Sequence, residues 1–255
     1  MSLVQIAREG AVAVVTLNRP PVNALSAELS ADLLAAFREC ADPGVRAVVV
    51  TGEPHFAAGA DITGFRAAFE SGSDEVLASS LSDAIWELEG LAKPTIAAVR
   101  GFALGGGLEL AMGADFRYLS DDAKVGQPEI MLGIIPGAGG TQRLPRIVGY
   151  QRAKEIVYSG RHVAAEEAAA IGLADKVVAN PDLLDVALAD AVEWAKGPTE
   201  AIGAAKRALN LGWGQPLDQA MAIEASEFAT AFRTADAREG VTAFLEKRRP
   251  EFSGN

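Results

Sequence analysis

The chain has 255 residues, of which 49% are hydrophobic and 22% are charged, a balance typical of a folded protein with a sizeable core. It contains 23 Lys and Arg against 34 Asp and Glu, and the resulting net charge of -11 has the wrong sign for a protein that grips nucleic acid. A single cysteine and two widely separated histidines exclude an internal disulfide and a Cys/His zinc site.

The sequence also shows none of the patterns that direct a protein to a membrane. Its first ten residues carry charges of both signs and lack the apolar stretch of a secretion signal. No apolar run approaches the roughly 20 residues that span a bilayer. We therefore expect a cytoplasmic protein with neither a nucleic-acid nor a membrane partner.

Short apolar runs and amphipathic stretches alternate along the first two thirds of the chain. The apolar runs are bounded by Gly, Pro or Asn, which predicts buried strands at residues 12–17, 47–51 and 95–99. Ser26 is the predicted N-cap of a helix that ends before the turn at residues 42–44. A second helix is predicted from about residue 74 to Gly90.

Helical patterns dominate after residue 140, where the strand signals fade. Amphipathic helices are predicted around residues 187–195, 201–209, 219–228 and 238–248. Pro181 and Pro198 indicate helix starts rather than flexible linkers. The pattern indicates a mixed α/β part followed by a mostly helical part.

The glycine-rich loops do not match the common nucleotide or hydrolase motifs. The run GIIPGAGGTQ contains G-x-G, but Gln142 occupies the third glycine position of the dinucleotide fingerprint. The P-loop, G-x-S-x-G and HExxH patterns are all absent from the sequence. The sequence therefore gives no support for a kinase, a P-loop protein, a serine hydrolase or a zinc protease.

Two other glycine-rich turns follow predicted strands. One is FAAGAD around Gly59, and the other is GFALGGGLEL, in which Gly105, Gly106 and Gly107 open a helix. Successive glycines before a helix let the backbone approach a ligand, and the free amides of the first turn can stabilise a negative oxygen. A tight turn or close helix packing is the structural alternative.

Two glutamates stand in apolar surroundings. Glu109 lies in LELAM, where the helix is apolar on nearly every face, and Glu129 lies in GQPEIMLG. A buried carboxylate without partners costs several kcal/mol, which favours a chemical purpose, although a surface position on an Ala-rich helix is the alternative for Glu109. Two such carboxylates can be tuned to different pKa values and share proton transfers.

The segments FAAGADI, ALGGGLELA and GQPEIMLGIIPGAGGTQRL closely resemble the crotonase superfamily and are most similar to its enoyl-CoA hydratases. The resemblance extends from TLNRP through GLADKVV to FLEKR and covers essentially the whole chain. It implies an α/β fold in which a spiral of ββα units, residues 1–195, precedes a helical C-terminal trimerisation region, residues 196–255. It also implies a homotrimer, or a hexamer formed as a dimer of trimers.

The resemblance assigns roles by motif match. Ala60 and Gly106 would donate backbone amides to the thioester oxygen and hold the enolate charge that develops there. Glu109 and Glu129 match the two catalytic glutamates that hold and activate one water molecule, with Glu109 as the base-like partner and Glu129 as the proton donor to C2. The amides of the turn at residues 136–139 would orient the Glu129 carboxylate.

The resemblance implies no separate cofactor, because the substrate is itself carried as a coenzyme A thioester. The binding residues that it implies are Ala58, Ala60, Asp61, Ile62, Gly106, Phe244 and Lys247, the last two reaching a neighbouring subunit's ligand. Asp61 is alternatively a helix cap. Many relatives carry a lysine after ADI where this chain has Thr63, which leaves Arg66 and the basic run at residues 247–249 as candidate phosphate contacts.

The leading functional hypothesis is an enoyl-CoA hydratase that converts 2-trans-enoyl-CoA to 3-hydroxyacyl-CoA in fatty acid or related acyl-CoA degradation. A Δ3-Δ2 enoyl-CoA isomerase is the first alternative, because one carboxylate suffices to move a proton between C2 and C4. A non-catalytic acyl-CoA-binding homologue is the second. Residues 64–80, where family members shape the acyl pocket, carry no motif.

Overall fold

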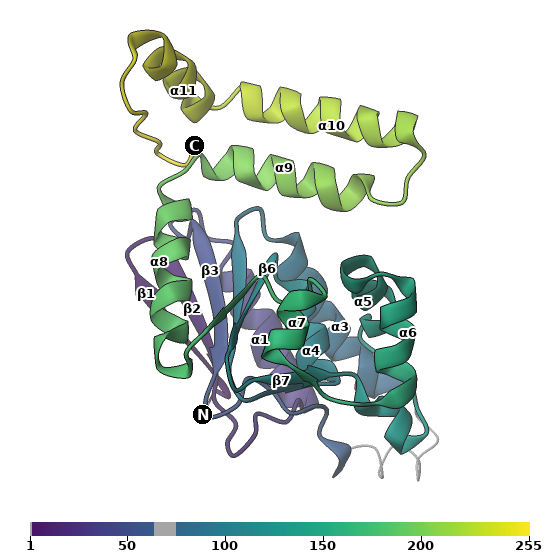
Figure 1. Cartoon of the computed structure of the whole chain (residues 1–255). Coiled ribbons are helices and arrows are strands. Elements are labelled where there is room, and N and C mark those ends of the chain that lie inside the picture. The colour runs from purple at the N-terminus through teal and green to yellow at the C-terminus, as the bar shows by residue number, and fades with distance from the viewer. Residues whose placement is uncertain (1, 64–74) are drawn as a thin grey trace.

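A computed structural model describes residues 2–63 and 75–255 (Figure 1). The predicted phosphate contact Arg66, and residues 64–74 of the predicted acyl-pocket segment, lie outside the described residues. No helix in the described part of the chain is long and apolar enough to cross a membrane.

A six-stranded sheet in the order β1-β2-β3-β4-β6-β9 forms the centre of the molecule. β1 pairs antiparallel with β2, and the remaining neighbours pair in parallel. The strands are β1 (Val4–Glu9), β2 (Val12–Leu17), β3 (Ala47–Gly52), β4 (Thr95–Val99), β6 (Phe116–Ser120) and β9 (Lys176–Val178). The three strands predicted from the sequence are confirmed.

Helices cover both faces of this sheet, because successive strand residues point to opposite sides. In β3, Val48 and Val50 pack in the larger hydrophobic cluster, with α1 (Ala27–Glu39) and α3 (Glu75–Gly90). Val49 points the other way, into a smaller cluster beneath α8 (Leu183–Ala195). The predicted cap of α1 is confirmed, since the Ser26 side chain accepts a hydrogen bond from the amide of Leu29.

A second, three-stranded sheet carries the elements that matter for the site. Its order is β5-β7-β8, with β5 (Phe102–Leu104) parallel to β7 (Lys124–Gly126) and β8 (Val163–Ala164) antiparallel to β7. β5 leads into α4 (Gly106–Gly113), and β7 leads into the short 3-10 helix η1 (Pro128–Leu132). The turns after β5 and β7 therefore lie side by side, and the Gly105 amide donates to the Gly126 carbonyl at 2.9 Å.

The rest of the chain is helical, as predicted, apart from two short strands. The helices are α5 (Gly140–Val148), α6 (Tyr150–Ser159), α7 (Ala165–Ala170), α9 (Thr199–Gly212), α10 (Leu217–Phe232) and α11 (Ala235–Glu246). β8 and β9 lie in the part of the chain where the strand signals fade, and the sequence did not predict them. With two and three residues, they are too short to show a period in the sequence. In Figure 1, α9, α10 and α11 stand apart from the sheet as a separate layer.

The close approach of α4 to the turn before Gly59 can be tested at Gly107. A Cβ added there would stand 2.1 Å from the carbonyl oxygen of Ala57, a backbone atom that cannot swing away. We expect Gly107→Ala to lower the free energy of unfolding by about 1–3 kcal/mol, measured by urea denaturation. Gly90→Ala is the matched control, because nothing lies within 4 Å of its added Cβ. Equal losses in both variants would contradict the packing described here.

Candidate active site

Glu109 is buried in the middle of α4, all of whose residues are buried. Glu109 is only 2% exposed, so the alternative that it is a surface glutamate is wrong. The Oε1 oxygen accepts hydrogen bonds from the amides of Ala138 and Gly140, each at 2.7 Å. Two amide donors compensate a buried carboxylate for much of the hydration that it loses.

These donors correct one expectation from the sequence. The turn before α5 was predicted to orient Glu129, whereas its amides bind Glu109. The reason is geometric: Gly140 is the first residue of α5, and the unpaired amides at a helix N-terminus favour the carboxylate toward which they point. Here they point toward α4 rather than η1.

Glu129 approaches the same place from η1. Its Oε1 oxygen lies 3.0 Å from the position that a Cβ on Gly105 would occupy, and Oε2 of Glu109 lies 3.9 Å from the corresponding position on Gly106. The contact at Gly105 is tight enough to favour glycine there, whereas the distance at Gly106 is an ordinary van der Waals contact. The structure thus brings both predicted glutamates to the glycine turn between β5 and α4.

Gln127 is a further residue of this site that the motifs did not single out. It is fully buried at the end of β7. With the amide oriented to suit its neighbours, its nitrogen donates to Glu129 Oε1 at 2.8 Å and to Oε2 at 3.1 Å. The available signal in the sequence was an uncharged polar side chain between the apolar residues Val125 and Pro128.

The two carboxyl groups have different electrostatic surroundings. Burial raises the pKa of Glu109, while the Gly140 and Ala138 amides and the positive charge of Arg143 oppose that rise. Burial, together with the nearby charge of Glu109, raises the pKa of Glu129 to about 7. A carboxyl group with this pKa can both give and take a proton near neutral pH.

The two backbone amides predicted to bind the thioester oxygen are those of Ala60 and Gly106. Leu25 binds the residues on either side of Ala60, since its amide donates to Gly59 and its carbonyl accepts from Asp61. The Ala60 amide itself, like that of Gly106, donates to no other group in the described part of the chain. Gly59 and Gly105 are in contact across the turn, with 3.8 Å between the Gly59 Cα and a Cβ placed on Gly105. The predicted pair of amides therefore lies on two neighbouring backbone segments, each next to one of these glycines.

Of the predicted coenzyme-binding residues near Ala60, two make hydrogen bonds and one is exposed. The Ala58 amide donates to the Val22 carbonyl at 3.0 Å, whereas the Ile62 side chain is 59% exposed. Asp61 accepts from the Thr63 amide at 3.1 Å and from the Thr63 hydroxyl at 2.6 Å, and it pairs with Arg19. These bonds hold the pKa of Asp61 below its ordinary value. The contacts fit the helix-cap alternative for Asp61.

Phe244 and Lys247 lie away from the other predicted site residues. Both are exposed at the end of α11, which Figure 1 places beyond α9 and far from α4. Within a single chain they do not join the glutamates. In the adjacent basic run, Arg248 is engaged by Glu239 at 2.6 Å and Glu246 at 2.7 Å.

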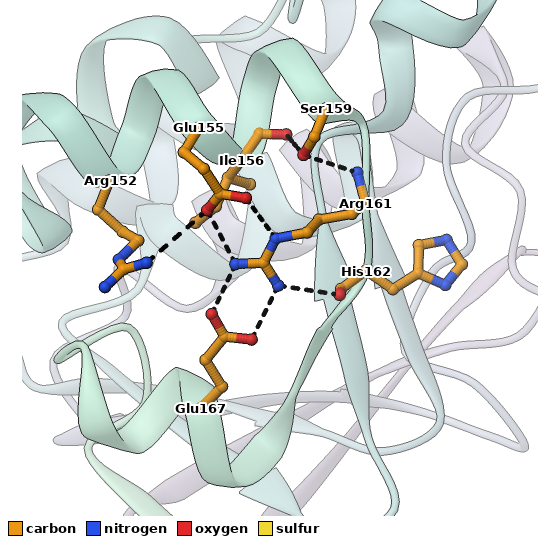
Figure 2. Close-up of polar contacts among 7 residues, drawn as sticks. All are labelled: Arg152, Glu155, Ile156, Ser159, Arg161, His162 and Glu167. Carbon is orange, nitrogen blue, oxygen red and sulfur yellow. Dashed lines mark hydrogen bonds and ion pairs between the residues drawn. The ribbon is translucent and has the colours of Figure 1, made fainter.

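A charged cluster supports the elements next to η1 (Figure 2). The Arg161 guanidinium pairs with Glu155 of α6 at 2.5 Å and with Glu167 of α7 at 2.6 Å. These pairs hold the pKa values of both glutamates below their ordinary value. α6 packs against η1, so the cluster helps to hold the helix against which the Glu129 segment packs. Because the groups are about one-third exposed, each pair contributes at most about 1 kcal/mol.

Known proteins resemble the chain over its whole length. The sequence model of a family described as enoyl-CoA hydratase/isomerase matches residues 7–255. The short-chain-enoyl-CoA hydratase of Clostridium acetobutylicum is 42% identical over 250 residues, covering 96% of this chain and 95% of that one. The crotonyl-CoA hydratase of Syntrophomonas wolfei has the same identity and coverage.

Solved structures show the same architecture. A crystal structure of an enoyl-CoA hydratase from Bacillus anthracis superposes with a TM-score of 0.93 at 36% identity, covering 99% of this chain and 100% of that one. The likeness confirms the crotonase-like α/β fold with C-terminal helices that the sequence motifs predicted.

The raised pKa of Glu129 makes a prediction for stability. Its ordinary value is 4.5 and its value here is about 7, so the folded protein binds this proton more tightly than the unfolded chain does. Stability therefore falls as the pH rises through this interval. We expect Glu129→Gln to raise the free energy of unfolding by about 2 kcal/mol near pH 8, a benefit that disappears below about pH 4.5.

Urea denaturation at both pH values measures this difference. Glu9→Gln, an exposed change on β1, is the control that should alter neither value. A stabilisation by Glu129→Gln that is the same at both pH values would contradict the assignment of the raised pKa.

Proposed function

Because the chain belongs to the enoyl-CoA hydratase/isomerase family, we propose that it is a hydratase that adds water across the C2–C3 double bond of 2-trans-enoyl-CoA to give 3-hydroxyacyl-CoA. Relatives named as hydratases at 42% identity support this reaction. The single observation that carries it is the convergence of Glu109 and Glu129 on one glycine turn.

The proposed mechanism divides the reaction between side chains and backbone. The oxygen of water bonds to C3 while a glutamate takes its proton, and the electron pair of the double bond moves toward the thioester oxygen. The Ala60 and Gly106 amides hold that developing negative charge, a role in which one donor is typically worth about 3 kcal/mol. A proton delivered to C2 completes the addition.

The proton roles follow from the surroundings of the two carboxyl groups. Glu109 uses Oε1 for two amides, which leaves Oε2 on the side of Gly106 to bind the water and act as the base. The Glu129 carboxyl, with its pKa raised to about 7, suits proton delivery to C2. Gln127 donates to the Glu129 carboxyl and fixes its direction.

The isomerase alternative requires only one carboxylate, so a second carboxylate close to the same glycine turn favours hydration. The chemistry needs no separate cofactor, since coenzyme A is part of the substrate. Within the described residues, no group of three or more His, Cys, Asp or Glu side chains is placed to hold a metal ion. We assign the reaction to the cytoplasm and to fatty acid or related acyl-CoA degradation.

The C-terminal helices support a homo-oligomer, a trimer or a dimer of trimers. α10 has no buried residue, although it carries several large apolar side chains. α9–α11 and the turn between α9 and α10 carry large apolar residues that are each more than half exposed. They are Leu209, Leu211, Trp213, Leu217, Met221, Phe228, Phe232, Val241, Phe244 and Leu245. An exposed apolar surface of this extent marks a protein interface.

The same assembly would complete coenzyme A binding. Phe244 and Lys247 are exposed and lie on the helical end of the chain away from its own glutamates, which supports the proposal that they reach the ligand of a neighbour. The backbone around Ala58 and Ile62, with the amides of Ala60 and Gly106, would hold the near end of the ligand.

Hydration itself is the first test of the proposed function. When the protein is mixed with 2-enoyl-CoA thioesters of several chain lengths, we expect the ultraviolet absorbance of the conjugated enoyl group to fall. Glu109→Gln and Glu129→Gln should each lower kcat by about 10²–10⁴-fold without unfolding the protein, because each removes a proton-transfer group. Glu9→Gln should retain full activity.

The alternatives give different results. Turnover of 3-enoyl but no 2-enoyl thioester would replace the hydratase by the isomerase. Binding without any turnover would leave the non-catalytic homologue. Full activity in both glutamine variants would remove the two glutamates from the mechanism.

Oligomerisation is tested by mass measured in solution. We expect the wild-type chain to elute as a trimer or hexamer in size-exclusion chromatography with light scattering. Met221→Glu combined with Phe228→Glu should produce smaller species, because two charges would enter an apolar contact. Val192→Glu, at an apolar position of α8 that is 37% exposed, is the control. A monomeric wild-type protein would contradict the proposal.

A further inference from the structure

The guanidinium of Arg143 lies between α5 and α3, next to the loop that binds Glu109. Its side chain is only 12% exposed. Nη2 and Nε both donate to Oε2 of Glu89, at 2.6 and 3.3 Å, and Nη1 donates to the carbonyl of Ala138 at 3.1 Å. The guanidinium thus joins a carboxylate of α3 to the backbone of the loop.

The carbonyl that Arg143 binds belongs to the peptide group between the two donors to Glu109. The Ala138 amide precedes this peptide group and the Gly140 amide follows it, and both donate to Oε1 of Glu109. Gly139 lies directly against the guanidinium, since a Cβ placed there would be 2.1 Å from Nη1. A shift of Arg143 would therefore displace both donors together.

α3 holds the guanidinium through two residues on one face of the helix. Glu89 supplies the carboxylate, and the ring of Trp86, three residues earlier, lies 5.1 Å from the Arg143 Cζ. This distance is within the range of a cation–π contact. Trp86 is 66% exposed, so packing within the hydrophobic core does not account for its position.

We propose that Arg143 is a positioning residue for Glu109: Glu89 and Trp86 fix the guanidinium, and the guanidinium fixes the backbone that holds the Glu109 carboxylate in place. The inference rests on the proposed hydratase function for its catalytic consequence. Its structural part, the hold of Arg143 on Glu109, stands independently of any reaction.

Charge acts in the same direction as geometry. Among the described charged groups, Arg143 acts on the pKa of Glu109, and Glu109 in turn acts on the pKa of Glu129. The positive charge of Arg143 favours the ionised form of Glu109, against the effect of burial, and so lowers its pKa. A base must be ionised before it can take a proton, so loss of this charge should raise the pH at which Glu109 becomes active.

Three variants separate geometry from charge. Arg143→Gln removes both, and we expect kcat to fall about 10- to 100-fold with little change in KM, because a displaced base costs rate rather than binding. The acidic limb of the kcat/KM profile should move to higher pH. Arg143→Lys keeps the charge without the planar fork, so it should restore the pH limb but not kcat. Glu89→Gln should lower kcat less than Arg143→Gln does.

Arg146→Gln is the matched control. Arg146 lies one turn further along α5, is exposed, and donates to Gln142 rather than to the Glu109 loop. It should leave kcat and the pH limb unchanged. If Arg143 has only a structural role, Arg143→Gln lowers the midpoint of thermal unfolding but leaves kcat per folded molecule and the acidic limb of the pH profile at the wild-type values. That result would overturn the proposal.

A second readout does not depend on turnover. Infrared difference spectroscopy across a pH titration follows the carboxyl stretch of Glu109, identified by its absence in Glu109→Gln. We expect the Glu109 titration to move to higher pH in Arg143→Gln and to stay in place in Arg146→Gln. If the wild-type protein hydrates no 2-enoyl thioester, the proposed function fails alone, and the titration still decides the positioning role. An unmoved titration in Arg143→Gln overturns that role.

Discussion

The parallel pairing of two three-residue strands, β5 and β7, determines where every group of the candidate site lies. Leu104 is paired with Gly126, so the glycine turn after β5 and the segment that leads to Glu129 leave the small sheet side by side. A parallel bridge between Ala57 and Ala103 places a third backbone segment, residues 57–60, beside these two. Glycines stand where the three segments end, at Gly59, Gly105 and Gly126, because the backbones nearly touch there.

This crowding has an electrostatic consequence. Glu109 is almost fully enclosed, and a carboxylate in that position is unfavourable unless donors replace the water that it has lost. Two amides at the start of α5 and the nearby Arg143 supply that compensation. Glu129 has weaker compensation and a neighbouring negative charge, which raises its pKa to about 7. Two chemically identical groups are thereby prepared for different proton-transfer roles, at some expense in stability.

The acidic character of the chain bears on how a polyanionic ligand would be held. With a net charge of -11, the surface as a whole repels coenzyme A, so binding needs backbone amides or a local basic group. Arg248 is already engaged by Glu239 and Glu246, which leaves Lys247 and Arg249 as the cations of that run without an ion pair in the described part of the chain. The apolar faces of α9–α11 offer a physical reason for assembly, and assembly would carry Lys247 to a neighbour.

Local sequence patterns are enough to predict the three strands, the Ser26 cap and the glycine turn that opens α4, and the motifs identify the fold. They leave the burial of Glu109 open, because a surface position on an Ala-rich helix fits the same residues. The packing around α4 decides it. Only the tertiary structure decided which partner each group meets. The turn at residues 136–139 follows Glu129 by only 7–10 residues and Glu109 by 27–30. The direction of the α5 N-terminus nevertheless selects Glu109 rather than Glu129. Gln127, the Arg143–Glu89 pair and the short strands β8 and β9 likewise depend on contacts between segments distant in the chain, for which no local period exists.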